Sequence, residues 1–108
     1  MTAGARVVLC TVPSERVAET IARALVEERL VACVNIIPGI RSIYRWQDKV
    51  EDERELMLVM KTQAERYVDI ERRVRALHPH EVCEVVALDA VSVSAPYLAW
   101  LFAETSLT

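Results

Sequence analysis

Two cysteines and two histidines are the residues of this sequence best suited to binding a metal ion. Cys10 lies near the N-terminus, whereas His78, His80 and Cys83 lie close together much later in the chain. Thiolate sulfur and imidazole nitrogen are ligands that Cu(I), Cu(II) and Zn(II) favour. If the strand containing Cys10 pairs antiparallel with the strand around Cys83, the four side chains approach one another at one end of a sheet. The sequence therefore predicts a soft-metal site formed by these four residues.

Structural roles for the same residues stay open. Cys10 lies within an apolar stretch, where a free cysteine commonly serves as a small core residue. His78 precedes Pro79 and could cap the carbonyls of a preceding helix. No Cys-x-x-Cys or His-x-x-x-His spacing is present, so the sequence does not predict a preformed zinc site.

A second set of residues is a candidate for a small-molecule pocket. Lys61 and Glu84 fall at the ends of predicted strands, and Trp46 lies near the tip of a predicted hairpin. In an oligomer, these side chains could line a cleft between subunits, where ligand pockets often occur. The competing interpretation is that Lys61 is a solvated strand end and Trp46 a packing residue.

The composition indicates one globular domain spanning residues 1–108. The chain is 53% hydrophobic and 27% charged, a balance typical of globular proteins. Its formal net charge is −3, and it has no basic patch interleaved with aromatic residues, so we expect no nucleic-acid partner. Two glycines cannot supply a phosphate-binding loop, and we expect no organic cofactor. No apolar run is long enough to cross a membrane, so we expect no membrane partner. The three cysteines lack a disulfide-scaffold spacing, which predicts a cytoplasmic protein.

Hydrophobic periodicity predicts four strands and three helices in the order β-α-β-β-α-β-α. Ser14 and Ser94 are the expected N-caps of the first and last helices, and Pro38-Gly39 marks a bend or bulge. The first strand is expected to be buried on both faces. The strands are predicted at residues 6–12, 31–47, 49–62 and 81–90, and the helices from 14 to about 29, at 64–77 and at 96–104.

This order predicts an α+β ferredoxin-like βαββαβ sandwich with strand order four-one-three-two and a short C-terminal helix. The hairpin at residues 31–62 is much longer than ordinary strands of about 5–6 residues, so it must extend beyond the sheet. Its outer strand is an unpaired edge carrying Ile43, Tyr44 and Trp46, which favours association with another subunit. A closed symmetric assembly leaves no free edge, so we expect an oligomer with these three residues at the interface.

Several segments resemble the CutA family of divalent-cation tolerance proteins. The resemblance runs from about residue 7 to residue 101 and is carried by several motifs in the same order. It implies a very stable homotrimer of ferredoxin-like subunits, with a role in tolerance of copper and other divalent cations. The matching motifs are LCT at residues 9–11 with Pro13, VACVNIIPG at 31–39, SIYRW at 42–46, Lys61-Thr62, Leu77-His78-Pro79 and YLAWL at 97–101.

The resemblance also implies specific ligands and reveals departures. The copper ligands proposed for the family are the cysteine matching Cys10 and a histidine pair before a proline. Here that pair reads Leu77-His78, so one ligand is missing, and whether His80 or Cys83 replaces it stays open. The family's hairpin turn usually contains a glycine where this chain has Asp48, which predicts a strained or altered turn because Asp tolerates the left-handed conformation less well.

Three classes of function follow from these observations. The leading hypothesis is a non-enzymatic, cytoplasmic homotrimer that binds a divalent metal ion, with copper as the first candidate. The alternative is a small-molecule sensor resembling the PII-type trimers, or a scaffold, without metal chemistry of its own. Catalysis of the acylphosphatase type is disfavoured because Pro13 removes a backbone donor after the first strand and no nucleophile–base pair is evident.

Overall fold

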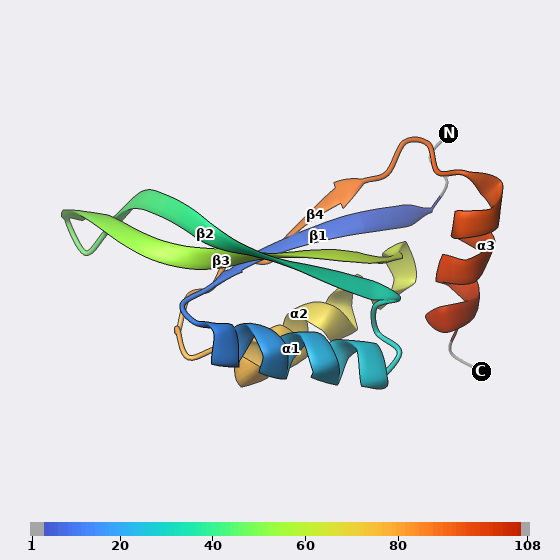
Figure 1. Ribbon diagram of the computed structural model, residues 1–108, viewed down its shortest axis with the longest axis horizontal. Helices are drawn as coiled ribbons and strands as arrows, with labels where there is room; N and C mark the ends of the chain where they lie inside the picture. Colours follow the sequence, from blue (N-terminus) through green and yellow to red (C-terminus); the bar gives the residue numbers. More distant parts are fainter. Residues whose placement is uncertain (1–3, 107–108) are drawn as a thin grey trace.

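Four antiparallel strands form a single sheet in the order β2-β3-β1-β4, and helices α1 and α2 cover one of its faces (Figure 1). The computed structural model describes residues 4–106. The predicted ferredoxin-like topology, with its strand order and both helices on one face, is confirmed. The elements are β1 (Ala5–Val12), α1 (Glu15–Glu27), β2 (Cys33–Trp46), β3 (Lys49–Gln63), a 3-10 turn η1 (Ala64–Arg66), α2 (Tyr67–Leu77), β4 (Val86–Asp89) and α3 (Ala95–Glu104).

The hydrophobic core lies between the sheet and the two helices. Val8, Cys10 and Val12 alternate along β1 and are fully buried against the helical layer. Val7 and Leu9 point to the opposite face and are only half-buried. The prediction that β1 is buried on both faces is therefore wrong for the single chain, because neither α1 nor α2 covers the second face of the sheet.

Helix α1 begins as predicted and ends earlier. The Ser14 hydroxyl accepts a hydrogen bond from the Val17 amide at 3.2 Å, which satisfies one of the free donors of the first turn. The helix closes with Arg29 in the left-handed conformation, at a φ of 61°. The Leu30 amide then donates to the Leu25 carbonyl at 2.9 Å, the pattern that terminates many helices. Ser94 occupies the N-cap position of α3, but its side chain makes no capping hydrogen bond, which corrects that prediction.

The fourth strand is shorter than predicted. We expected residues 81–90, but β4 is limited to Val86–Asp89 because β1 pairs with it only from Arg6 to Leu9. The carbonyl of Val85 accepts a hydrogen bond from the Tyr67 hydroxyl of α2 at 3.1 Å. Residues 79–85 consequently form a loop between α2 and β4, and this loop borders the cavity described below.

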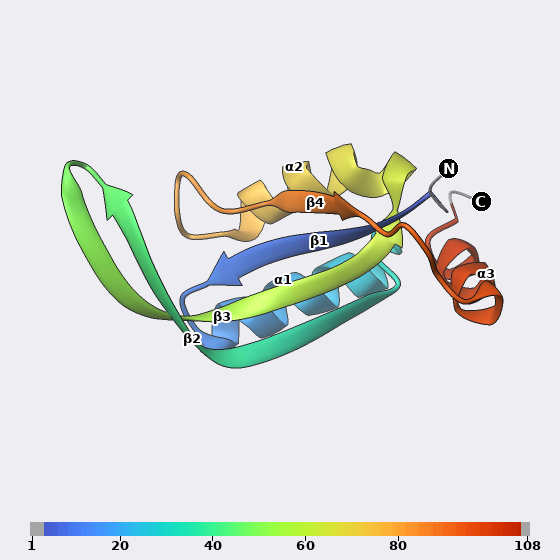
Figure 2. The ribbon, with the colours of Figure 1, turned by 90° about the horizontal axis from the view of Figure 1, so that it is seen from above.

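The β2–β3 hairpin extends well beyond the other two strands and bends toward the side of the loop between α2 and β4 (Figure 2). The predicted bulge is confirmed: the register shifts between Ile37 and Ile40, with Gly39 at a φ of 77°. Such a bulge bends a strand and increases its twist. At the tip, Gln47 and Asp48 have φ angles of 48° and 65°, so the two-residue turn holds both of them in the left-handed region, as type I′ hairpins require.

The turn generates a stability prediction. Asp48→Gly should stabilise the protein by about 0.5–1 kcal/mol, because glycine adopts a positive φ without the steric cost that a β-carbon brings. The measurement is the melting temperature at matched protein concentration. Gly39→Ala is the opposing control: nothing lies within 4 Å of an added β-carbon, but φ is +77°, so it should lower the melting temperature. A melting temperature of Asp48→Gly below that of the parent would contradict this interpretation of the turn.

Candidate functional site

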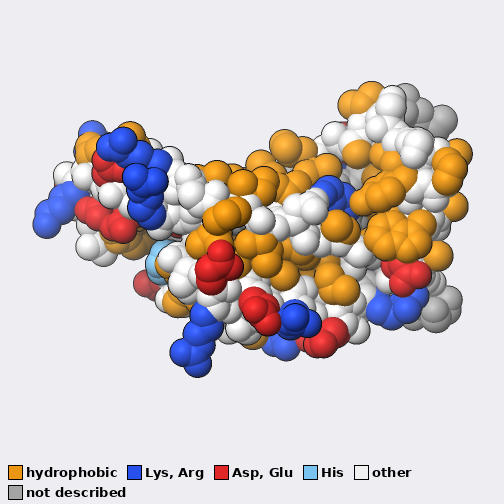
Figure 3. All heavy atoms as spheres, in the orientation of Figure 1, with side chains coloured by type: hydrophobic (Ala, Val, Ile, Leu, Met, Phe, Trp, Pro, Cys, Tyr) orange, Lys and Arg blue, Asp and Glu red, His pale blue; other side chains and the backbone are white. Residues whose placement is uncertain are grey.

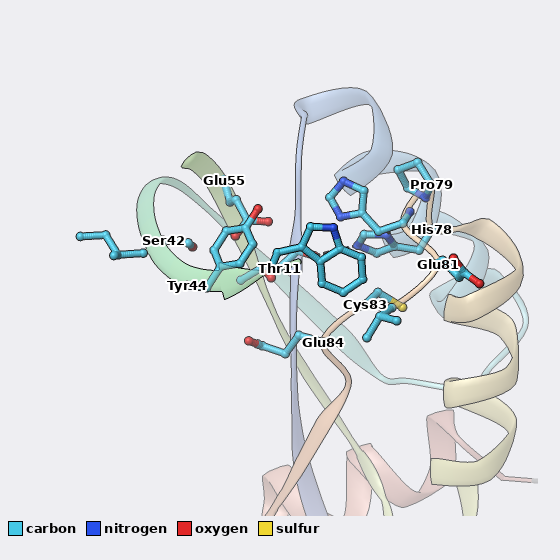
Figure 4. A pocket seen from close by; sticks show the side chains of 13 residues that line it. Thr11, Ser42, Tyr44, Glu55, His78, Pro79, Glu81, Cys83 and Glu84 are labelled. Atoms are coloured by element: carbon cyan, nitrogen blue, oxygen red, sulfur yellow. Dashed lines mark hydrogen bonds between the residues drawn. The ribbon is translucent and has the colours of Figure 1, made fainter. Parts of the chain in front are cut away.

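A cavity of about 690 Å³ lies between the outer half of the hairpin and the loop that follows α2 (Figure 4). In this view Tyr44 and Glu55 of the hairpin lie on one side, and His78 and Pro79 of the loop lie on the other. The curvature of the hairpin brings these two segments within reach of the same space. The lining residues are Thr11 of β1, Ser42, Ile43, Tyr44 and Trp46 of β2, Glu55 of β3, and the seven residues 78–84.

His78 is held at the inner end of the loop by both of its ring nitrogens. Its Nδ1 accepts a hydrogen bond from the His80 amide at 3.1 Å. The ring proton must then reside on Nε2, which donates to the Thr11 carbonyl at 2.8 Å. A metal ion could bind His78 only by breaking one of these bonds. The geometry therefore gives His78 a structural role, fastening the loop to the end of β1.

His80 and Cys83 are more accessible than His78 and Cys10. His80 is exposed, and its ring lies 5.0 Å from that of His78, centroid to centroid. Within residues 4–106 no hydrogen bond engages the His80 ring nitrogens. Cys83 is partly buried, and burial raises the pKa of its thiol. Both side chains line the cavity, so imidazole and thiol groups are presented from the same loop.

Cys10 does not belong to this cavity. It is fully buried and faces the helical layer, where its Sγ donates weakly to the Thr11 carbonyl at 3.7 Å. Burial, reinforced by the thiol of Cys83 and the carboxylates of Glu84 and Glu55, raises the pKa of the Cys10 thiol to about 12. Because the thiolate is the form that binds metals, Cys10 is a core residue in this conformation.

The four predicted metal ligands are thus only partly brought together. His78, His80 and Cys83 border one cavity, whereas Cys10 lies behind it in the core. In the part of the chain that the structure describes, no three His, Cys, Asp or Glu side chains are grouped closely enough to hold a metal ion. The single chain therefore does not contain the complete site that the sequence predicted.

The predicted small-molecule residues also separate. Trp46 and Glu84 line the cavity. Lys61 does not: it lies at the far end of the hairpin, opposite Cys33, and its Nζ donates to the Asn35 side-chain oxygen. Within one chain Lys61 lies apart from Trp46, because Lys61 pairs near the start of β2 and Trp46 lies at its end. The sequence placed these residues in a cleft between subunits, so a shared pocket stays a prediction for the oligomer.

The three predicted interface residues are all accessible in the single chain. The exposed fractions of Ile43, Tyr44 and Trp46 are 65%, 40% and 44%, and all three border the cavity. Exposed apolar side chains also gather over the uncovered part of the sheet (Figure 3), where β4 contributes Val86 and Leu88. Exposed apolar surface of this extent is typical of an interaction site.

Sequence reasoning missed an acidic component of the cavity. Glu55 lies on the lining, and Glu51, Glu53 and Glu55 alternate along β3, which places their side chains on one face. The pKa of the Tyr44 phenol is raised by burial and by these three carboxylates, and the pKa of Glu84 is raised by burial and by Glu55. The alternation of the three glutamates was visible in the sequence, but the face of the hairpin on which their side chains lie depends on how β2 and β3 are paired.

Comparison with known proteins agrees with this architecture. The family model of the CutA1 divalent ion tolerance proteins matches residues 6–104. A relative named divalent-cation tolerance protein CutA, from Thermus thermophilus, is 57% identical over 95 residues, which are 88% of this chain and 92% of the relative. A solved structure of the divalent cation tolerance protein Cut A1 from Thermus thermophilus has a TM-score of 0.92 at 54% identity and covers 94% of this chain and 99% of that one.

A more distant structure has the same fold. It is described as the periplasmic divalent cation tolerance protein CutA from Archaeoglobus fulgidus, with a TM-score of 0.92 and 30% identity, covering 94% of this chain and 99% of that one. The fold and the cavity define a ferredoxin-like domain with an extended β2–β3 hairpin. The chain belongs to the CutA1 family of divalent ion tolerance proteins. Among residues 4–106, no helix is both long and apolar enough to cross a lipid bilayer.

The burial of Cys10 generates a prediction about thiol reactivity. In the native protein near pH 8, iodoacetamide should modify Cys83 while Cys10 stays unmodified, because Cys10 is buried and its pKa is raised to about 12. Peptide mass spectrometry after timed alkylation is the measurement. The control is the same reaction in denaturant, where both thiols should react at comparable rates. Equal rates for Cys10 and Cys83 in the native protein would show that Cys10 is accessible.

Proposed function

We propose that this protein is a non-enzymatic homotrimer that binds divalent metal ions, with copper as the first candidate, and that His80 and Cys83 supply the ligands from each chain. The observation that supports the metal site is the pairing of an uncommitted imidazole and a thiol on one loop, at the edge of an acidic cavity. Copper accepts both donor types. The family's description as divalent ion tolerance proteins agrees with this assignment.

The chain's own residues set the conditions for binding. The thiol of Cys83 has a raised pKa, so a metal ion must displace its proton, and affinity should increase with pH. His80 and Cys83 provide two donors, and most metal sites need more. Glu81 and Glu84 line the same cavity and could add oxygen ligands after a rearrangement of the loop, and a neighbouring subunit is the other source.

Metal binding is tested by substitution of the two proposed ligands. Cys83→Ser and His80→Ala should each weaken copper binding by roughly tenfold or more, because each removes one of the few donors available. Cys10→Ala should leave the affinity unchanged, since the Cys10 thiol is buried and protonated. Equilibrium dialysis at two pH values gives the affinities. Loss of binding in Cys10→Ala with retention in Cys83→Ser would refute the proposed ligand set and favour the deeper site.

The trimer is supported by two surfaces that the single chain leaves uncovered. Strand β2 is an edge of the sheet, and its long outer half presents unpaired backbone groups to solvent. The sheet face opposite α1 and α2 exposes Val86 and Leu88. A closed assembly with rotational symmetry can cover both surfaces at once. Three is the number that the resemblance to the family implies.

The assembly has its own test. Light scattering after size exclusion should give three times the chain mass of 12.2 kDa. Ile43→Glu should shift the protein toward smaller species, because it would bury a carboxylate in an apolar contact. Val68→Glu is the matched control, since Val68 is equally exposed, at 65%, and lies on α2. A monomeric parent, or dissociation by Val68→Glu alone, would contradict the proposed interface.

The remaining parts of the proposal concern location and alternatives. A cytoplasmic location is supported by three free cysteines and is tested by fractionation of the producing cell.

A PII-like sensor of nucleotides is disfavoured because Glu55, Glu81 and Glu84 line the cavity and no lysine or arginine does among the described residues. Phosphate groups would meet a field of their own sign there.

A further inference from the structure

Helix α3 is apolar around its circumference although it lies at the surface of the chain. Only Glu104 is charged among its ten residues, and only Leu101 is buried. The exposed fractions of Tyr97 and Trp100 are 38% and 43%. A helix that is hydrophobic on every side is normally covered by protein. The single chain therefore leaves α3 without the cover that its composition requires.

The exposed side of α3 continues the uncovered face of the sheet. Val7 pairs with Leu88 on one side and with Lys61 on the other, so these three side chains form one row on the face opposite α1 and α2. Cys33 extends the row, because it pairs with Lys61. Burial and the neighbouring Cys33 thiol raise the pKa of the Tyr97 phenol, which places Tyr97 beside this row. In Figure 3 apolar side chains extend from the sheet face to the end of the molecule where α3 lies.

Side chains from three other segments hold the C-terminal end of α3 in place. The Arg66 Nε donates to the Thr105 carbonyl at 2.8 Å, and the Gln63 amide donates to the Thr105 hydroxyl at 2.8 Å. Arg29 donates to the Ala103 carbonyl at 2.7 Å. Guanidinium groups at a helix C-terminus also complement the helix dipole. The aromatic residues of α3 are therefore fixed in position before any partner binds, which lowers the entropy lost on association.

We propose that α3 is part of the subunit interface, with Tyr97 and Trp100 as anchors that pack against a second copy of the chain. The two rings already contact each other, with centroids 5.4 Å apart and planes tilted by 48°. Tryptophan and tyrosine are enriched among the residues that dominate interface energetics. This interface rests on the proposed homotrimer and adds α3 to the hairpin residues already assigned to it.

A second copy of the chain is the occupant that fits this surface. In the closed assembly proposed above, another subunit covers the sheet face, and α3 borders that face, so the same subunit reaches the helix. Charge favours the same occupant. Lys61, the charged side chain in the row beside Tyr97, already donates to the Asn35 side-chain oxygen, so the partner need not supply a carboxylate there. An uncharged apolar surface is what another copy of this chain offers.

Trp100 reports directly on whether α3 is covered. The chain has two tryptophans, so Trp46→Phe leaves Trp100 as the single indole and keeps an aromatic ring in the hairpin. Acrylamide quenching of the assembled variant is compared with that of N-acetyltryptophanamide. We expect the quenching constant of Trp100 to be about tenfold lower, because the core of an interface is packed as closely as a protein interior. Adding Ile43→Glu, which disrupts the proposed hairpin contact, should raise the constant.

Truncation of the anchor tests its contribution to assembly. Trp100→Ala should raise the protein concentration of half-dissociation, at a fixed urea concentration, by about tenfold or more. Trp100→Phe should retain most of the stability of the assembly because it keeps a ring. Val26→Ala is the matched control, since Val26 is equally exposed, at 43%, and lies on α1. Light scattering over a dilution series gives these concentrations.

Three results would overturn the role of α3. Quenching of Trp100 as strong as that of the free indole, in a protein that is a trimer, would show that the helix stays uncovered while the trimer itself stands. Unchanged dissociation in Trp100→Ala, or an equal change in Val26→Ala, would show that no anchor lies there. A monomeric parent would refute the trimer and the α3 interface together. Quenching decides if Trp100→Ala does not fold, and the dilution series decides if Trp46→Phe dissociates.

Discussion

The antiparallel pairing of β2 with β3 is the interaction on which the rest of the structure depends. It continues from Cys33 opposite Lys61 to Trp46 opposite Lys49, although only the inner part of β3 is also paired with β1. Beyond that point the two strands support only each other. An isolated two-stranded ribbon is marginal in water, so the outer half gains stability only if its side chains contact something else. The bulge at Gly39 directs those side chains toward the loop after α2, and the cavity is the space between them.

A second constraint fixes the other wall of the cavity. The hydrogen bonds from His78 to Thr11 and from His80 to His78 tie the loop to the end of β1, the strand at the centre of the core. Because both nitrogens of His78 are used, its proton position is determined by the fold. Protonation of the second nitrogen would break the contact with the His80 amide, since a protonated imidazole cannot accept a hydrogen bond. The residue that most resembles a metal ligand in the sequence thus serves to position the residues beside it.

The sequence predicted the fold more completely than the site. The element order, the strand order, the Ser14 cap and the bulge at Pro38-Gly39 follow from local patterns, and all are confirmed. The short β4 could not be predicted because its length depends on contacts with distant segments. Strand β1 pairs with it only from Arg6 to Leu9, and the Val85 carbonyl accepts a hydrogen bond from the Tyr67 hydroxyl of α2. Glu55 was missed for a similar reason. The face of the hairpin on which its side chain lies depends on the register of β2 with β3, and that register is set by the two-residue turn and the bulge. Lys61 lies apart from Trp46 within one chain, and whether a neighbouring subunit brings the two together stays a prediction, because the sequence placed them in a cleft between subunits.

Burial determines which of the thiols near the cavity can take part in chemistry. Cys10 and Cys83 are close enough for the charge of one to affect the pKa of the other, yet only Cys83 lines the cavity. The cost of creating a thiolate rises with desolvation, so the more exposed sulfur of Cys83 would be the better ligand for any metal ion of the proposed site. In the proposed metal site, His80 and Cys83 would take the place of the histidine that the resemblance implies at Leu77. The loop that carries them lies at the surface, where it is held by His78 and is not part of the sheet.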